Sequence, residues 1–124
     1  NPQHANGYNN RAIHYYHQKK WDLAVADFNK AIQINPQHTK AYKNRGLLYF
    51  QQKKWELALA DFNKAIQINP EDGDSLGFRG IIHVMRGNKQ KAIQDLQKAV
   101  PLLKAQNSTA GYQTVVKVLQ QLQK

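Results

Sequence analysis

The sequence repeats itself along most of its length, and this repeat limits the folds that the chain can adopt. Residues 1–34 match residues 35–68 at 23 of 34 positions without a gap. Residues 69–102 continue the period more loosely, through Asn69-Pro70, Arg79-Gly80 and Ala92-Ile93. A period of this length indicates structural units that bury their apolar faces by stacking on one another.

Each cycle has the pattern of two helices joined by a short turn. In the second cycle, apolar residues from Tyr42 to Phe50 mark a first helix, which is interrupted near Gln52-Lys53-Lys54. Apolar residues three and four apart from Trp55 onward mark a second helix. Asn69-Pro70 ends it, because the residue before a proline is pushed out of the helical region. We expect small residues to let the helices approach and large aromatic residues to fill the gaps opposite them. The small residues are Ala24, Ala31, Gly46, Ala58, Ala65, Gly80, Ala92 and Ala99, and the large ones are Tyr15, Trp21, Phe28, Tyr49, Trp55 and Phe62.

At these positions the chain resembles the tetratricopeptide repeat family, in the tandem form of bacterial members. The aromatic, small, alanine and proline positions of that motif are matched by Tyr8, Ala12, Tyr15, Ala24, Phe28, Ala31 and Pro36. The second cycle matches with Tyr42, Gly46, Tyr49, Ala58, Phe62, Ala65 and Pro70, and the third with Leu76, Gly80, His83, Ala92, Leu96 and Ala99 but no closing proline. The resemblance implies an all-α, right-handed α-solenoid: three helix-turn-helix hairpins at about residues 5–36, 39–70 and 73–102, within a single domain over 1–124.

The two ends of the chain depart from the repeat. Asn107-Ser108-Thr109 predicts the start of a helix over about residues 108–124, with apolar residues such as Tyr112 and Val115 on one face. We expect this helix to cover the exposed end of the third hairpin. At the other end, Asn1-Pro2 matches the closing Asn-Pro of a repeat. This predicts either further repeats upstream in the parent protein or an exposed first hairpin that forms homo-oligomers.

One position departs from the family motif in every cycle. Arg11, Arg45 and Arg79 stand where the family usually has leucine, and Asp27, Asp61 and Asp95 follow sixteen residues later. A lone arginine at a packing position is costly, so we predict an ion pair between the two helices of each hairpin. The alternative is an arginine that faces a ligand.

The resemblance also implies a concave groove lined by the first helices of the hairpins. The groove positions are Asn6, Asn9, Asn10, Ile13, Tyr16 and His17, then Lys40, Lys43, Asn44, Leu47, Phe50 and Gln51, and then Phe78 and Ile81 with their neighbours Asp74, Gly77, Val84 and Met85. Five of the first six differ from their counterparts in the second cycle, although most of the second helix is unchanged. This distribution favours an inner surface that has diversified over drift at exposed positions.

The groove positions predict the chemistry of a partner. Amides and lysines at one end suit an extended or acidic segment of a protein or peptide, because amides both donate and accept hydrogen bonds. The apolar end, at Phe78 and Ile81, takes either a hydrophobic side chain or the C-terminal helix. Some family members bind acidic chaperone tails through a two-carboxylate clamp. At those clamp positions the sequence has Asn9, Ile13, Asn44, Asp74 and Phe78, of which only Asn44 fits.

Composition argues against several other functions. The chain has no cysteine, which excludes disulfides, thiolate metal sites and cysteine nucleophiles. It has no phosphate loop or nucleophile elbow, so we expect no enzyme, no cofactor and no metal. His14 and His17 lack a third ligand, and His4 and His38 are expected to be turn residues repeated by duplication. No apolar run is long enough to span a bilayer. The compartment stays open, the cytoplasm being slightly favoured.

The charge balance is strongly basic. Eighteen Lys and Arg residues against eight Asp and Glu residues give a net charge of +10, which favours acidic partners or contributes to solubility alone. A set of lysines on the outer side can also bind phosphates, which keeps a basic RNA-binding helical repeat as the alternative to a protein-interaction scaffold. These are Lys19, Lys20, Lys30, Lys53, Lys54, Lys64, Lys89, Lys91 and Lys98.

Overall fold

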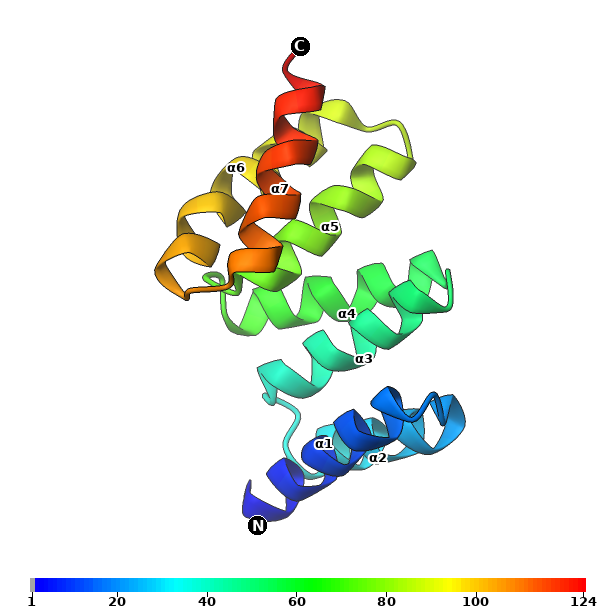
Figure 1. Ribbon diagram of the computed structural model, residues 1–124. Helices are drawn as coiled ribbons and strands as arrows, with labels where there is room; N and C mark the ends of the chain where they lie inside the picture. Colours follow the sequence, from blue (N-terminus) through cyan, green and yellow to red (C-terminus); the bar gives the residue numbers. More distant parts are fainter. Residues whose placement is uncertain (1) are drawn as a thin grey trace. The chain divides into compact units, whose positions relative to one another are not determined.

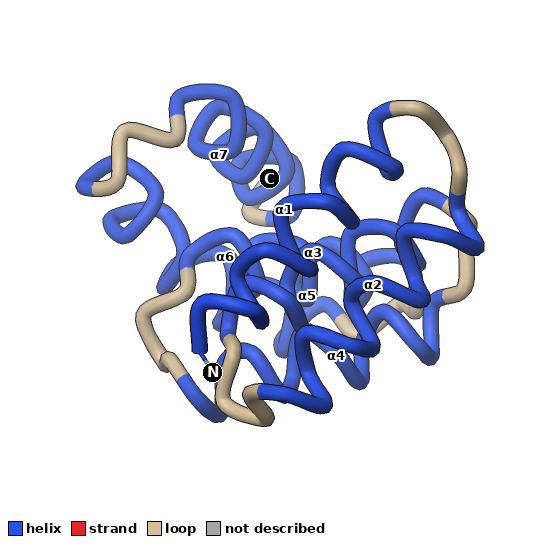
Figure 2. The backbone as a smooth tube through the Cα atoms, turned by 90° about the horizontal axis from the view of Figure 1, so that it is seen from below, coloured by secondary structure: helices blue, strands red, loops and turns tan. Residues whose placement is uncertain are grey.

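The computed structural model describes residues 2–124, and this part of the chain consists of helices joined by short loops (Figure 2). The helices are α1 (Pro2–His17), α2 (Trp21–Ile34), α3 (Thr39–Gln51), α4 (Trp55–Ile68), α5 (Gly73–Met85), α6 (Lys89–Ala105) and α7 (Thr109–Leu122). Asn1, the first residue of the Asn1-Pro2 pair that matches the closing Asn-Pro of a repeat, lies outside the described residues. The chain forms two compact units, Asn1–Ile68 and Asn69–Lys124, which are described in turn.

The first unit contains two hairpins, α1–α2 and α3–α4 (Figure 1). Within each hairpin, a small residue of the first helix lies against an aromatic ring of the second. A Cβ atom added at Gly46 would lie 2.9 Å from Cε1 of Phe62 and 3.2 Å from Cβ of Asp61. Ala12 occupies the same position above Phe28, and both are buried. The α2 helix also packs on α3, which joins the two hairpins through a core that includes Leu48.

The turn inside each hairpin is the same in all three cycles. Lys19, Lys53 and Gly87 occupy the same position of their cycles and have positive φ angles of 61°, 60° and 75°. In the first hairpin, the N–H of Lys20 donates to the carbonyl of Tyr15 at 2.9 Å, which closes the end of α1. This is the hydrogen bond of a Schellman ending, which usually selects glycine at the left-handed residue. Lysine occupies this left-handed position in two of the three turns. Lys19 and Lys53, which the sequence assigns to the basic outer surface, are therefore turn residues.

The second unit contains the third hairpin, α5–α6, and the final helix α7, which packs on both of them (Figure 1). Val115 of α7 is buried, and its Cγ2 would lie 3.0 Å from a Cβ atom added at Gly77 of α5. Leu103, near the end of α6, is buried and lies close to Gly73. The α7 helix therefore covers the third hairpin as the sequence predicts, and small residues of α5 permit the close approach.

Two helices extend beyond the approximate repeat bounds predicted from the sequence. The α1 helix begins at Pro2, ahead of the repeat predicted from about residue 5, because proline has no N–H to satisfy and its φ angle suits the first helical turn. His4 is consequently inside a helix and not in a turn. The α6 helix continues past residue 102 to Ala105, with Pro101 inside it. Ser108 precedes α7, but its side chain makes no capping hydrogen bond.

Each hairpin also contains the Arg–Asp contact that the sequence places sixteen residues apart. In the second hairpin, Nε and Nη2 of Arg45 donate to the two carboxylate oxygens of Asp61 at 2.8 and 2.7 Å. Arg11 makes the same two bonds to Asp27, at 2.6 and 2.8 Å. All three aspartates are buried, and Asp61 raises the pKa of Arg45 through these hydrogen bonds. The geometry is bidentate, which is the strongest arrangement for this pair of side chains.

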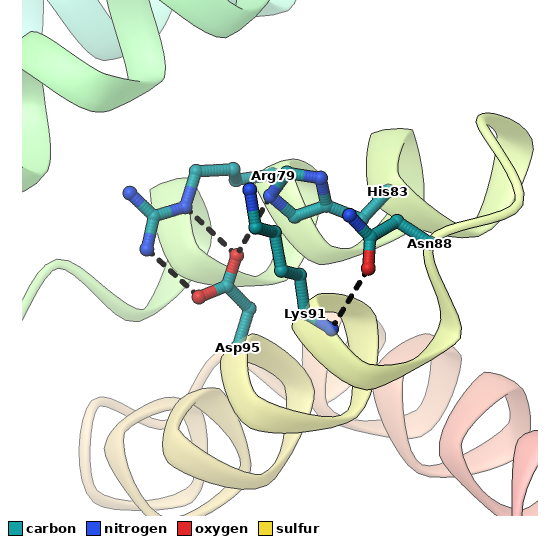
Figure 3. A network of polar contacts seen from close by, with 5 residues as sticks. All are labelled: Arg79, His83, Asn88, Lys91 and Asp95. Atoms are coloured by element: carbon teal, nitrogen blue, oxygen red, sulfur yellow. Dashed lines mark hydrogen bonds and ion pairs between the residues drawn. The ribbon is translucent and has the colours of Figure 1, made fainter.

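The third hairpin carries a larger polar cluster (Figure 3). Nε and Nη2 of Arg79 each donate to Asp95 at 2.8 Å. His83, which replaces the packing aromatic of its cycle, has its Nε2 3.7 Å from the same carboxylate. Burial lowers the pKa of His83, and the charge of Asp95 opposes this effect. At the start of α6, the side chain of Asn88 accepts from the backbone N–H of Lys91 and caps the helix.

The ion pair of the second hairpin can be tested against leucine, the residue that the family motif prefers. Arg45→Leu is expected to lower the free energy of unfolding by about 1–3 kcal/mol, because it leaves the Asp61 carboxylate buried without a charged partner. Asp61→Asn is expected to cost less, since Arg45 reaches solvent and asparagine still accepts a hydrogen bond. Urea unfolding of both variants and of the double variant measures the coupling. An Arg45→Leu variant that unfolds no earlier than Asp61→Asn would argue against a stabilising pair.

The small residue at the helix crossing can be tested with two glycines. Gly46→Leu is expected to lower the free energy of unfolding by about 1–3 kcal/mol, because the new side chain must displace the Phe62 ring. Gly7→Leu is the matched control, since a Cβ atom at Gly7 meets nothing within 4 Å. It is expected to be neutral or slightly stabilising, because glycine is a poor helix former. Equal thermal stability of the two variants would contradict the packing role of Gly46.

Candidate functional site

The candidate site of the first unit is the face shared by α1 and α3, where twelve of the fourteen predicted groove residues lie. A pocket of about 240 Å³ opens there, lined by Ile13, Tyr16, His17, Phe28, Asn44 and Leu47. Five of these six are predicted groove residues. The sixth, Phe28, is a buried packing residue of α2 that reaches the pocket from beneath. The structure therefore brings together the central part of the predicted groove.

Asn44 is the polar group of this pocket. Its side-chain amide has two N–H donors and an acceptor oxygen, and one N–H donates to Oδ1 of Asn9 at 3.3 Å. The second N–H and the oxygen of Asn44 are left for other hydrogen bonds. Asn9 is only 4% exposed, so it ties α1 to α3. The prediction that Asn9 is an open ligand-binding amide is therefore corrected: burial and the hydrogen bond to Asn44 give it an internal role.

A second polar contact between α1 and α3 involves His38, which the sequence presents only as a turn residue. His38 precedes α3, and its Nδ1 accepts from the backbone N–H of Ala41 at 3.2 Å. Its Nε2 lies 2.9 Å from Oδ1 of Asn6. Both contacts are satisfied by a neutral ring with the proton on Nε2. The ring thus caps α3 and fixes Asn6, another predicted groove residue, against it.

The rim of the pocket carries aromatic and polar side chains. Tyr16 is half-buried and contacts the rings of His17 and Trp21 edge to face, with ring centroids 5.4 and 5.6 Å apart. Phe50 of α3 contacts Trp55 in the same way, at 5.2 Å. Both rings are thereby held at the turn end of their hairpins. The exposed predicted residues on this face are Asn6, Asn10, His17, Lys40 and Gln51, and Lys43 is half-buried.

The remaining two predicted groove residues lie in the second unit. Phe78 and Ile81 of α5 line a separate pocket of about 240 Å³, together with Asp74, Gly77, Leu103, Gly111, Thr114 and Val115. Since α7 contributes Thr114 and Val115, the apolar face of α5 receives the C-terminal helix, which is one of the two outcomes that the sequence leaves open. The pocket is the part of that face that α7 does not fill.

The described residues contain no cluster of three or more His, Asp or Glu side chains suited to a metal ion. His14 and His17 lie on α1 without such neighbours. Within residues 2–124, no helix has the length and apolar character needed to cross a membrane.

The polar contact of His38 predicts a pH dependence. Burial, and to a smaller extent the charge of Lys40, lowers the pKa of His38 below its ordinary value of 6.5. The unfolded chain then takes up a proton that the folded chain does not, so stability falls as the pH drops below 6.5. Urea unfolding at pH 7.5 and 5.5 measures this loss.

The matched control for this prediction is His38→Asp, because Asp72 caps α5 at the same repeat position by accepting from the N–H of Ser75. The variant keeps a cap that does not titrate between these two pH values. We expect a smaller loss of stability in the variant than in the parent chain. An equal loss in both would assign the pH dependence to other groups, such as His83.

Comparisons with known proteins agree with this architecture. The family model described as Tetratricopeptide repeat matches residues 5–38 and 39–72, more than half of the chain. No curated protein sequence matches the chain significantly.

Among solved structures, the TPR2B domain of yeast Sti1, in a complex with pHsp70, is similar with a TM-score of 0.85 and 18% identity over 98% of this chain and 97% of that chain. The TPR domain of Arabidopsis OM64 has a TM-score of 0.82 and 22% identity over 97% of each chain. The first TPR of Spaghetti (RPAP3), bound to the HSP90 peptide SRMEEVD, has a TM-score of 0.79 and 22% identity over 96% of this chain and 95% of that chain. These likenesses confirm the predicted fold class, an all-α solenoid of three hairpins with a C-terminal helix. The chain belongs to the tetratricopeptide repeat family.

Proposed function

We propose that the chain is a non-enzymatic protein-interaction scaffold that binds an extended segment of a partner protein on the α1–α3 face. The observation that carries this proposal is the pocket of about 240 Å³, with apolar walls and the partly unused amide of Asn44 at its edge. Similar structures support it, since two of them are complexes, one with pHsp70 and one with an HSP90 peptide.

The pocket chemistry specifies what such a segment contains. Ile13, Tyr16 and Leu47 provide apolar walls for one aliphatic side chain of the segment. The second N–H and the oxygen of Asn44 suit the C=O and N–H of a peptide backbone, which is how an amide side chain recognises an extended strand without reading its sequence. The pocket therefore selects an aliphatic residue in an extended backbone.

Charge selects the residues that flank this aliphatic side chain. Lys40 is exposed and Lys43 half-buried on α3, in the same helix as Asn44, and the whole chain has a net charge of +10. Basic groups beside a pocket raise the association rate of acidic segments and disfavour basic ones. We infer a segment with acidic residues next to its aliphatic anchor.

The recognised segment differs from the chaperone tails of the similar structures. A carboxylate clamp needs basic and amide side chains at positions where this chain has Ile13, which lies in the apolar pocket, and Asn9, which is buried against Asn44. The proposal is therefore an internal acidic-aliphatic segment rather than a free C-terminal carboxylate.

The test uses the full chain and an array of ten-residue peptides that vary in charge and in the presence of one aliphatic residue. We expect enrichment of acidic peptides with a Leu, Ile or Val. The variant Asn10→Ala/Asn44→Ala is expected to bind the enriched peptides about tenfold more weakly, because hydrogen bonds to the peptide backbone are lost. Fluorescence anisotropy with labelled peptides measures the affinity.

The matched control is Gln33→Ala/Gln67→Ala, which removes two exposed amides that also share one repeat position but lie on α2 and α4. It is expected to bind as the parent chain does. Thermal unfolding of both variants checks that the loss of the Asn9–Asn44 bond has not unfolded the first unit. Equal affinity of the two double variants, or enrichment of basic peptides, would refute the proposed site.

A further inference from the structure

An exposed leucine follows the turn of each hairpin in the first unit. Leu23 on α2 and Leu57 on α4 hold the same position of their cycles, and both are 49% exposed. Leu57 has the α1–α2 hairpin before it in the chain, and Leu23 has the α3–α4 hairpin after it. Since the two are equally exposed, a neighbouring hairpin on either side leaves this position open. The exposure is therefore a property of the position within the repeat.

Basic and aromatic side chains surround the two leucines. Two exposed lysines precede each of them, and the tryptophan that begins α2 or α4 is half-buried between lysine and leucine in the sequence. The two turns lie on the same side of the first unit (Figure 1), and a pocket of about 340 Å³ beside the first turn is also lined by Gln52, just before the second turn. We call this surface the turn edge, and it consists of Lys19, Lys20, Trp21, Leu23, Lys53, Lys54, Trp55 and Leu57.

The third hairpin makes the same turn with different residues. Its corresponding positions hold Gly87, Asn88, Lys89 and Lys91, with neither tryptophan nor leucine. The side chain of Asn88 caps α6, whereas Lys20, at the same position of its cycle, makes no capping hydrogen bond through its side chain. The turn and the start of the second helix therefore form without the residues of the turn edge, so the fold alone does not account for them.

The chemistry of the turn edge fits the surface of an anionic membrane. Lysine side chains attract anionic headgroups, whereas indole rings and apolar side chains favour the layer between the headgroups and the acyl chains. Each turn also carries one carboxylate, Asp22 or Glu56, so the lysines outnumber the acidic groups. The net charge of +10 attracts the whole chain to an anionic surface from a longer distance.

Two other classes of partner use only part of this surface. An RNA strand binds lysines and stacks on aromatic rings, but it gains nothing from exposed leucines. A folded protein needs a matching cavity for each leucine, and the two leucines stand on separate helices beside protruding turns. A fluid lipid surface accepts both leucines without such a match.

We propose that the turn edge binds an anionic phospholipid surface, with its lysines at the headgroups and its leucines and tryptophans in the interfacial layer. The turn edge shares no residue with the pocket on the α1–α3 face. The proposal therefore stands independently of the proposed function.

The probes are vesicles of phosphatidylcholine alone and vesicles of an equal mixture of phosphatidylcholine and phosphatidylserine, added to the full-length chain. Trp21 and Trp55 are the two tryptophans of the sequence, so the intrinsic fluorescence reports on the turn edge itself. We expect the mixed vesicles to shift the tryptophan emission to shorter wavelength, and lipids brominated near the headgroup to quench it. Phosphatidylcholine alone is expected to do neither. Unchanged emission with the mixed vesicles would overturn the proposal.

Two double variants separate the charge of the turn edge from the charge of the whole chain. Lys20→Gln/Lys54→Gln is expected to weaken binding to the mixed vesicles about tenfold, because two ammonium groups leave the headgroup layer. The matched control is Lys30→Gln/Lys64→Gln, which removes the same charge farther along α2 and α4. It is expected to bind nearly as the parent chain does. Equal losses in a vesicle sedimentation assay would assign the binding to net charge, and the proposal would be wrong.

The apolar part of the turn edge is tested by Leu23→Gln/Leu57→Gln, which leaves every charge in place. This variant is expected to bind the mixed vesicles about tenfold more weakly, because its side chains no longer favour the interfacial layer. Its thermal stability should stay close to that of the parent chain, since half of each leucine is already exposed. If it binds as the parent chain does and single-stranded RNA displaces the vesicles, the turn edge is a nucleic-acid surface and the lipid proposal fails.

Discussion

The contact between a small residue of the first helix and a ring of the second sets the spacing on which the other interactions depend. A Cβ atom at Gly46 would lie within 3.2 Å of both the Phe62 ring and Cβ of Asp61, so the same close approach positions the ion pair. Gly80 repeats this arrangement against Leu96 and Asp95. Because Arg45 and Asp61 directly precede the small residue and the ring in sequence, a hairpin that packs correctly also brings the guanidinium and carboxylate within bonding distance. A larger residue at Gly46 would separate them together with the helices.

The parts of the structure that follow the period could be predicted from the sequence. The helices, their turns and the Arg–Asp spacing recur from cycle to cycle, so each is supported by two or three independent copies. The ends of α1 and α6 could not be predicted this way, because there the chain leaves the period. Pro101 lies inside α6, which continues to Ala105 although proline disfavours the interior of a helix. The burial of Leu103 between α6, Gly73 and α7 stabilises the last turn, and this tertiary contact overrides the local preference of proline.

The candidate site, too, could be predicted from the sequence only in part. The groove positions implied by the family resemblance include Ile13, Tyr16 and Leu47, and these three residues do line one pocket. The partners of Asn6 and Asn9 were not predictable, because each of the bonds Asn6–His38 and Asn9–Asn44 has one end at a position that has diverged between the cycles. Asn6 corresponds to Lys40 and Asn9 to Lys43, whereas His38 and Asn44 have identical counterparts in His4 and Asn10. A repeat shows what two cycles share, whereas these contacts depend on what they do not share.

These polar contacts bear on how such a face recognises a partner. His38 and Asn9 fix α3 against α1, so the apolar walls and the Asn44 amide are held in place before binding, which reduces the conformational entropy lost on association. The surplus of lysine acts over a longer distance: it raises the rate of encounter with acidic segments and is screened by salt. Under the proposed function, discrimination among acidic segments comes from the short-range part, the fit of one aliphatic side chain between Ile13 and Leu47 and the hydrogen bonds of Asn44. The proposal then separates two contributions: charge, which is spread over the whole chain, acts on the rate of encounter, and the pocket, which occupies one face, acts on the choice of partner.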